Sequence, residues 1–94
     1  MIPTCPPFPL GRVVATPGAL TACSRSGDDP TEFIRRHERR DWGNIGPEDW
    51  EKNDASLNDG LRIVSSYTLK NGDAIWVISE ADRSATTLLL PDEY

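Results

Sequence analysis

The stretch from Leu61 to Leu90 constrains the fold of this chain more than any other part of it. It reads LRIVSSYTL, KNGD, AIWVISEAD and RSATTLLL, which is three β-prone segments joined by two short polar connections. Branched and aromatic side chains favour strands, and short connections join neighbouring antiparallel strands. The stretch therefore predicts a three-stranded antiparallel meander.

A tight turn is predicted between the first two strands, at Asn71-Gly72. Both residue types tolerate positive φ, so the pair favours a two-residue type I′ turn, which sets Tyr67 opposite Trp76. Alternation along the strands then gives the sheet two unlike faces. We expect helices to cover the bulkier face, which carries Ile63, Tyr67, Leu69, Trp76 and Ile78. We expect the other face to be an open dimer or partner interface, with apolar residues Val64, Ile75 and Val77.

Three short helices are predicted before the meander, each with proline at its first position. Their N-caps are Thr16, Asp29 and Gly46, and Gly27 and Gly60 end the first and third helices. A short edge strand is expected within residues 11–16, around Val13-Val14. This order of elements indicates an α+β fold: a short N-terminal strand, three short helices and then the meander, with the helices packed on one sheet face.

Length and charge narrow the class of protein. The 94 residues suffice for one domain, which we place at residues 11–94, after a Pro-rich arm at residues 1–10. The formal net charge of −5 argues against general affinity for nucleic acid or anionic membranes, and no apolar run approaches membrane-spanning length. The N-terminus has no basic, signal-like segment, so a cytoplasmic protein is expected.

Neither cysteines nor histidine predict a catalytic or metal centre. Cys5 and Cys23 lack metal-ligand spacing, and two reduced thiols are favoured over a disulfide. His37 is the only histidine and so the only candidate for a general base of that type. It shares a helix side with Phe33 and Ile34, which favours a partly buried structural role over a catalytic one. We therefore assign no catalytic residue, no metal and no cofactor.

Two of the predicted helices carry opposite charge. The second exposes a basic cluster, made of Arg35, Arg36, Arg39 and Arg40. The third is acidic, and its candidate partner-binding residues are Glu48, Asp49, Glu51 and Asp54. Such clusters are either solvated faces or binding sites for opposite charge. As binding sites, the basic cluster would take phosphate or an acidic protein face, and the acidic helix would mimic the phosphates of a nucleic acid.

The connection between the second and third strands carries Asp82-Arg83-Ser84. As a recognition loop, it would use Arg83 for bidentate contacts with a partner. As a structural turn, it would use Asp82 as a cap and pair Arg83 with a neighbouring carboxylate. Both readings stay open, and the three residues join the candidate partner-binding set.

Four segments together resemble a family of short, plasmid-related bacterial proteins carried on mobile elements and many chromosomes. These segments are PLGRVVATPGAL, His37 with Asp41-Trp42-Gly43, GLRIVSSYTL and AIWVISEADRSATTLLLPDEY, and the most specific part is DRSATTLLLPDEY. Some members are labelled as a subunit of a type I restriction endonuclease, but such a subunit is a much larger protein than this chain. The start, MIPTCPPF, departs most from the family. The resemblance implies a mobile-element accessory protein that interferes with host defence, and it carries over no catalytic residue.

Size, acidity and the resemblance together predict a non-enzymatic interaction protein. The specific hypothesis is an anti-defence inhibitor, of anti-CRISPR or anti-restriction type, that binds and occludes a host nucleic-acid-processing complex. Its partner would be a protein, with neither direct sequence-specific nucleic acid nor membrane. The alternatives are a small RelE-like ribonuclease, by analogy of topology only, and a homodimeric regulator.

Overall fold

The computed structural model describes residues 8–94 and shows an α+β fold. Within these residues, three α-helices precede the meander and four strands form one mixed sheet in the order β1-β4-β3-β2. The bounds are β1 Arg12–Ala15, α1 Pro17–Ser26, α2 Pro30–Glu38, α3 Pro47–Asp59, β2 Ile63–Thr68, β3 Ala74–Ser79, β4 Ala85–Leu89 and the 3-10 helix η1 Pro91–Glu93. Most of the predicted Pro-rich arm, and with it Cys5, lies outside the described residues.

Most helix boundaries follow from local capping, as predicted, although α2 ends at Glu38, before Arg39 and Arg40 of the predicted basic cluster. Thr16 and Asp29 accept hydrogen bonds on their side chains from the first turns of α1 and α2, at 3.1 Å and 3.0 Å. Gly27 and Gly60 end α1 and α3 with positive φ. These signals lie within a few residues of each helix end, so they depend little on the rest of the fold.

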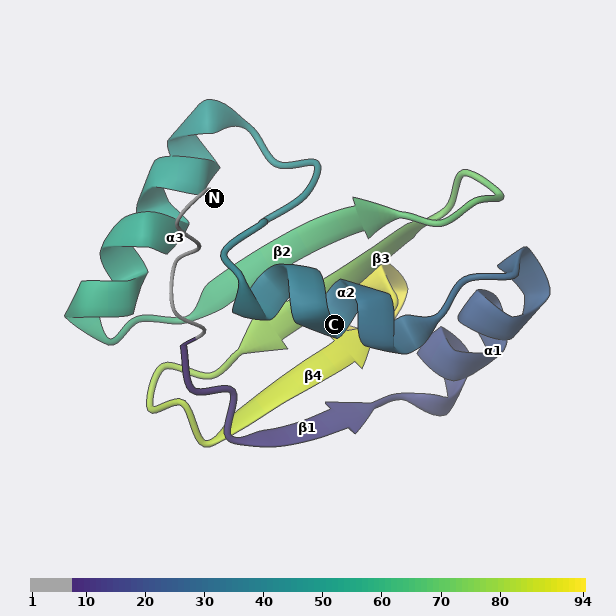
Figure 1. Cartoon of the computed structure of the whole chain (residues 1–94), viewed down its shortest axis with the longest axis horizontal. Helices are drawn as coiled ribbons and strands as arrows, with labels where there is room; N and C mark the ends of the chain where they lie inside the picture. Colours follow the sequence, from purple (N-terminus) through teal and green to yellow (C-terminus); the bar gives the residue numbers. More distant parts are fainter. Residues whose placement is uncertain (1–7) are drawn as a thin grey trace, which may run out of the picture.

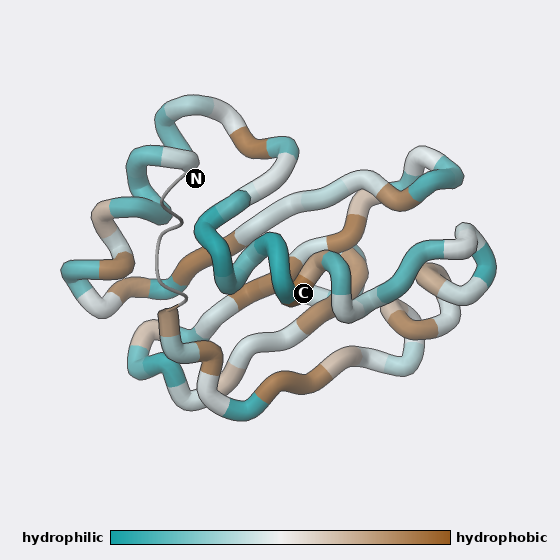
Figure 2. The backbone as a smooth tube through the Cα atoms, in the orientation of Figure 1, coloured by the Kyte–Doolittle hydropathy of each residue, from teal (hydrophilic) through white to brown (hydrophobic). Residues whose placement is uncertain are grey.

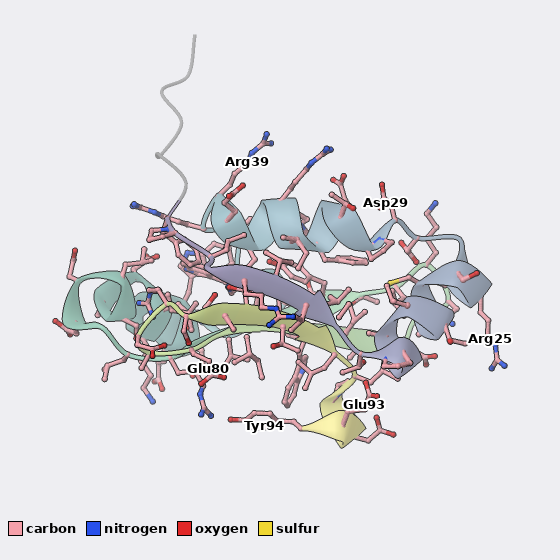
Figure 3. All side chains as sticks on the ribbon, turned by 90° about the horizontal axis from the view of Figure 1, so that it is seen from below. Arg25, Asp29, Arg39, Glu80, Glu93 and Tyr94 are labelled. Atoms are coloured by element: carbon pink, nitrogen blue, oxygen red, sulfur yellow. The ribbon has the colours of Figure 1, made fainter. Side chains whose placement is uncertain are left out.

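The helices take three different positions around the sheet (Figure 1). The α2 helix crosses one face of the sheet, α1 lies at one end, and α3 stands beside β2 at the other end. Figure 3 shows η1 on the face opposite α2. The predicted packing of all helices on one face therefore holds for α2 but not for α3, whose contacts are with the β2 edge.

The predicted meander is confirmed, because β2, β3 and β4 pair antiparallel in sequence order. The short strand expected around Val13-Val14 is also present, as β1 at the sheet edge. It pairs parallel with β4, and this makes the sheet mixed. Parallel pairing is possible because a long connection, with three helices and two strands, joins β1 to β4 in place of a hairpin.

The predicted register between β2 and β3 is wrong by one residue. Tyr67 faces Ile75, and Trp76 faces Ser66. The turn has three residues instead of two: Gly72 donates to the Leu69 carbonyl at 2.9 Å, and Leu69 donates to the Asp73 carbonyl at 2.8 Å. Gly72 alone has positive φ there, as in a type I turn closed by a left-handed glycine. One residue of slip moves every β3 side chain to the other face.

The corrected faces explain the core. Under α2, the largest cluster of buried side chains combines Phe33 with Tyr67, Ile75, Val77 and Leu88. A second cluster at the α3 end joins Trp42 and Ile63 with Phe8, which is 6% exposed. Phe8 belongs to the predicted N-terminal arm, so the packed structure begins before residue 11.

Candidate functional site

A surface cavity lies between α3 and the sheet face that α2 leaves uncovered. It is a groove of about 750 Å³. Its apolar floor and walls come from Ile45, Leu61, Val64 and Trp76. Charged residues at its margin are Asp49, Lys52 and Arg62. Leu61 is 56% exposed, so the groove offers an apolar surface directly to solvent. We call this cavity the α3 groove.

Partly buried polar contacts hold α3 in place beside the sheet. The Asn53 amide donates to the Val64 carbonyl at 2.8 Å and accepts from the Val64 N–H at 3.4 Å, so it acts like a strand partner at the β2 edge. The Trp42 indole N–H donates to the Asp54 carboxylate at 3.0 Å. Because these contacts fix the helix, the groove is a preformed feature of the fold.

The predicted acidic residues of α3 divide into two groups. Glu48, Asp49 and Glu51 are exposed near the start of the helix, and Asp49 lines the α3 groove. Asp54 instead serves the structure, because its carboxylate accepts the bond from Trp42. The first group therefore remains available to a partner, and we call it the acidic edge.

The C-terminus forms the opposite margin of the uncovered face. The Tyr94 ring meets the Trp76 ring edge-on, with centroids 5.9 Å apart. Arg62 donates to the Tyr94 hydroxyl and stands 3.7 Å from the Glu80 carboxylate. Figure 3 shows Tyr94 projecting below the sheet at the end of η1. Aromatic side chains that are exposed beside an apolar groove are typical of protein-binding surfaces.

The Asp82-Arg83-Ser84 loop has the geometry of a structural turn. The Arg83 guanidinium donates to four backbone carbonyls: Ser56 at 2.8 Å, Leu61 at 2.7 Å, Glu80 at 3.0 Å and Ala81 at 3.2 Å. The Asp82 carboxylate accepts from the Ser84 N–H at 3.0 Å. Bidentate contact of Arg83 with a partner is therefore not supported, because its donors already join the end of α3 to the β3–β4 turn. The alternative prediction, that Arg83 pairs with a neighbouring carboxylate, is wrong as well, because its partners are backbone carbonyls.

The predicted basic cluster also divides. Arg36 pairs with Asp41 at 2.8 Å and lies over the Tyr67 ring, 4.5 Å from its centre. Arg40 takes positive φ at the end of α2 and is partly buried. Arg35 and Arg39 are exposed, and Figure 3 shows Arg39 on the outer side of α2. The four arginines therefore do not form one continuous basic site.

The predicted dimer face does not exist as one surface. Ile75 and Val77 are fully buried under the helices, and Val64 lies on the opposite face, in the α3 groove. The cause is the register, since the type I′ turn would have kept these three residues together. An uncovered sheet face is nevertheless present, and it carries Val64, Ser66 and Trp76.

His37 is the centre of a buried chain of hydrogen bonds. Its Nδ1 lies 2.5 Å from Ser65 Oγ, and its Nε2 lies 2.9 Å from Ser79 Oγ. Ser79 Oγ lies 2.7 Å from Thr86 Oγ1, which donates to the Leu10 carbonyl at 2.8 Å. The Leu10 carbonyl can only accept, so Thr86 accepts from Ser79, and Ser79 accepts from His37 Nε2–H. Because burial lowers the pKa of His37 to about 3, the imidazole is neutral near pH 7, and Nδ1 then accepts from Ser65.

This environment supports a structural role for His37. The side chain has no exposed surface, and burial lowers its pKa from 6.5 to about 3, with a further contribution from the positive charge of Arg83. The rings of Phe8 and Trp42 pack edge-on against the imidazole, and the centroid of each lies 5.4 Å from the imidazole centroid. A general base needs contact with its substrate, which this ring does not have.

The buried neutral histidine predicts a stability that falls in mild acid. The unfolded chain gains a proton on His37 below pH 6.5, whereas the folded chain does so only near pH 3. The contribution of His37 to stability should therefore be constant above pH 6.5 and decrease by about 1.4 kcal/mol per pH unit below it. Urea unfolding between pH 5 and 7 measures this slope, and NMR of the single histidine follows its protonation directly. Titration of the folded protein near pH 6.5 would contradict the prediction.

Comparison with protein-family models, curated proteins and solved structures finds no match to this chain. The resemblance to plasmid-related proteins therefore stays a prediction. Within residues 8–94, no group of three or more histidine, cysteine or acidic side chains is placed to hold a metal ion. No helix in the same part of the chain is long and apolar enough to cross a membrane.

The α3 groove is not predictable from the sequence pattern, because its residues come from four separate segments. Ile45 precedes α3, Leu61 follows it, and Val64 and Trp76 meet only in the correct register. One available signal was the exposed Leu61 directly after the Gly60 stop, an apolar residue without a place in either element.

Proposed function

We propose that this chain is a non-enzymatic interaction protein that binds a protein partner through the α3 groove and the acidic edge. The observation that carries the proposal is the preformed, mainly apolar groove next to Glu48, Asp49 and Glu51. A groove of this kind buries an apolar anchor of a partner, while the carboxylates attract basic residues around it. The partner would therefore present an apolar side chain within a basic surface.

Basic surfaces with apolar anchors are typical of proteins that process nucleic acids. We propose that the chain occludes such a surface on a host defence complex, as expected of an anti-CRISPR or anti-restriction inhibitor of mobile-element origin. Its acidic edge would then lie where the phosphates of a nucleic acid otherwise bind to the partner. The proposal is supported by the net charge of −5 and by the resemblance to plasmid-related proteins.

Charge reversal of the acidic edge tests the electrostatic part. The triple variant Glu48→Lys, Asp49→Lys, Glu51→Lys should reduce capture of the partner from a bacterial lysate at least about tenfold, because attraction turns into repulsion. A matched triple variant, Glu32→Lys, Asp59→Lys, Asp92→Lys, changes the net charge equally at exposed positions elsewhere and should retain binding. Equal binding by both triple variants would contradict a role for the acidic edge.

Substitution in the groove tests the apolar part. Leu61→Asp places a charge where the partner's anchor would pack, and binding should fall about tenfold or more. Leu61 is 56% exposed, so the variant should remain folded. Leu20→Asp is the matched control, since Leu20 is 46% exposed on α1, at the other end of the sheet. Unchanged binding in Leu61→Asp would show that the groove is not the site.

The ribonuclease alternative finds no support in the position of His37, which is fully buried. A purified protein that cleaved RNA would nevertheless overturn the proposal. Since His37→Ala is expected to destabilise the protein strongly, loss of cleavage in that variant would have to be measured at an equal folded fraction.

A further inference from the structure

The outer edge of β1 is an open sheet edge. Arg12 and Thr16 donate their N–H groups to the Ser84 and Leu88 carbonyls, both at 3.0 Å, so even-numbered residues of β1 face β4. In a strand the intervening residues point the opposite way, which leaves the N–H and C=O groups of Val13 and Ala15 directed outward. Such an edge is a template for another strand.

The same edge exposes apolar side chains. All four β1 residues are exposed, with Val13 at 49% and Val14 at 38%. Figure 2 shows β1 as a hydrophobic stretch along one border of the molecule. A shallow groove of about 250 Å³ lies beside it, lined by Val13, Leu20 and Ile34. Figure 3 shows the molecule from the side of this border, with β1 at the front of the sheet.

We propose that β1 pairs antiparallel with β1 of a second copy, joining the two sheets into one. The outward groups determine the register. Pairing Val13 with Ala15 of the other copy, and Ala15 with its Val13, forms four backbone hydrogen bonds. The two Val14 residues then face each other at the two-fold axis as a non-hydrogen-bonded pair, where side chains approach most closely.

Charge complementarity in this register favours a second copy as the occupant. Arg12 comes to lie opposite Thr16 of the other copy, on the same face as η1. The Thr16 hydroxyl donates to the Glu93 carboxylate at 2.7 Å, so each Arg12 meets a carboxylate that is already held in position. The two-fold axis repeats this contact, which gives two ion pairs across the interface. It also brings the apolar grooves of both copies to the same side of the joined sheet.

This interface is independent of the function proposed above. The order β1-β4-β3-β2 places β1 and the α3 groove at opposite borders of the sheet. A dimer would therefore present two α3 grooves at its ends. Variants at either border can be tested without disturbing the other.

Ultracentrifugation of the full chain should show a concentration-dependent dimer. Val13→Pro removes an outward N–H from each copy and leaves the bonds to β4 intact, so it should raise the dimer dissociation constant about 10- to 100-fold. Its thermal melting, measured under monomeric conditions, should stay close to that of the wild type. A chain that stays monomeric at all concentrations, or a dimer that Val13→Pro does not weaken, would overturn the proposal.

Cysteine cross-linking tests the register separately, in a Cys5→Ser background. Val14→Cys should form a disulfide-linked dimer under mild oxidation, because facing residues of this pair lie about 4.5 Å apart between Cα atoms, within disulfide range. Val13→Cys is the matched control, since its two copies are diagonal neighbours about 7–8 Å apart and should cross-link much more slowly. Equal rates for both variants would rule out this pairing.

Discussion

Replacing His37 by alanine is expected to lower the free energy of unfolding by about 4 kcal/mol. The substitution removes a fully buried ring from between Phe8 and Trp42 and leaves a cavity. It also leaves the Ser65 hydroxyl without its partner on the ring, and Ser79 keeps only its bond to Thr86. Cavity formation and unsatisfied buried polar groups each cost about 1–3 kcal/mol or more.

Urea denaturation at pH 7.5 measures this loss, and Arg39→Ala provides the control at the C-cap of the same helix. Arg39 is exposed, so its variant should stay within about 0.5 kcal/mol of the wild type. His37→Phe fills the space but supplies no hydrogen bonds, and it should lie between wild type and His37→Ala. A loss under about 1 kcal/mol in His37→Ala would show that the hydrogen-bonded chain contributes little to stability.

Gly43→Ala is expected to be comparably damaging, with a loss of about 4 kcal/mol. Gly43 has a φ of +78°, and its backbone pairs with Ser66 at the β2 edge. A Cβ atom there would lie 2.1 Å from the Ser66 carbonyl oxygen and 2.5 Å from the Tyr67 ring. Left-handed strain costs about 1–2 kcal/mol, and the clash with a backbone that cannot move away adds about 2–3 kcal/mol.

Gly27→Ala separates these two contributions. Gly27 has the same φ of +78°, but nothing lies within 4 Å of an added Cβ atom. This variant should therefore lose only the 1–2 kcal/mol of left-handed strain. The difference between the two variants in urea denaturation gives the cost of the close approach. Equal losses would mean that the segment from Trp42 to Asn44 moves away from β2 at little cost.

The segment around Gly43 also shows how the α3 groove is built. The Ser66 N–H donates to the Trp42 carbonyl at 3.1 Å, and the Asn44 N–H donates to the Ser66 carbonyl at 2.6 Å. These bonds cover the β2 edge and lead the chain directly into α3. If Gly43→Ala loosens this connection, partner binding through the α3 groove should weaken even in molecules that stay folded.

The charged loops illustrate which functional predictions could not be made from sequence. Arg83 was a candidate for partner contact because a polar loop between strands is usually exposed. Its four carbonyl partners come from α3, the segment after it and its own turn. An arginine can reach across several residues, so its partners depend on tertiary position rather than on neighbours in sequence. The acidic edge was predictable because solvent exposure follows from helical periodicity alone.

The sequence by itself determined the α+β class, the meander and most helix boundaries, because these depend on capping residues, prolines and β-prone runs within a few residues. The tertiary structure alone decided the parallel pairing of β1, the register of β3 and the position of α3. A single left-handed glycine after a type I turn moved Trp76 into the α3 groove and Ile75 and Val77 into the core. Strand alternation has a period of two, so one residue in a turn is enough to exchange the buried and open faces.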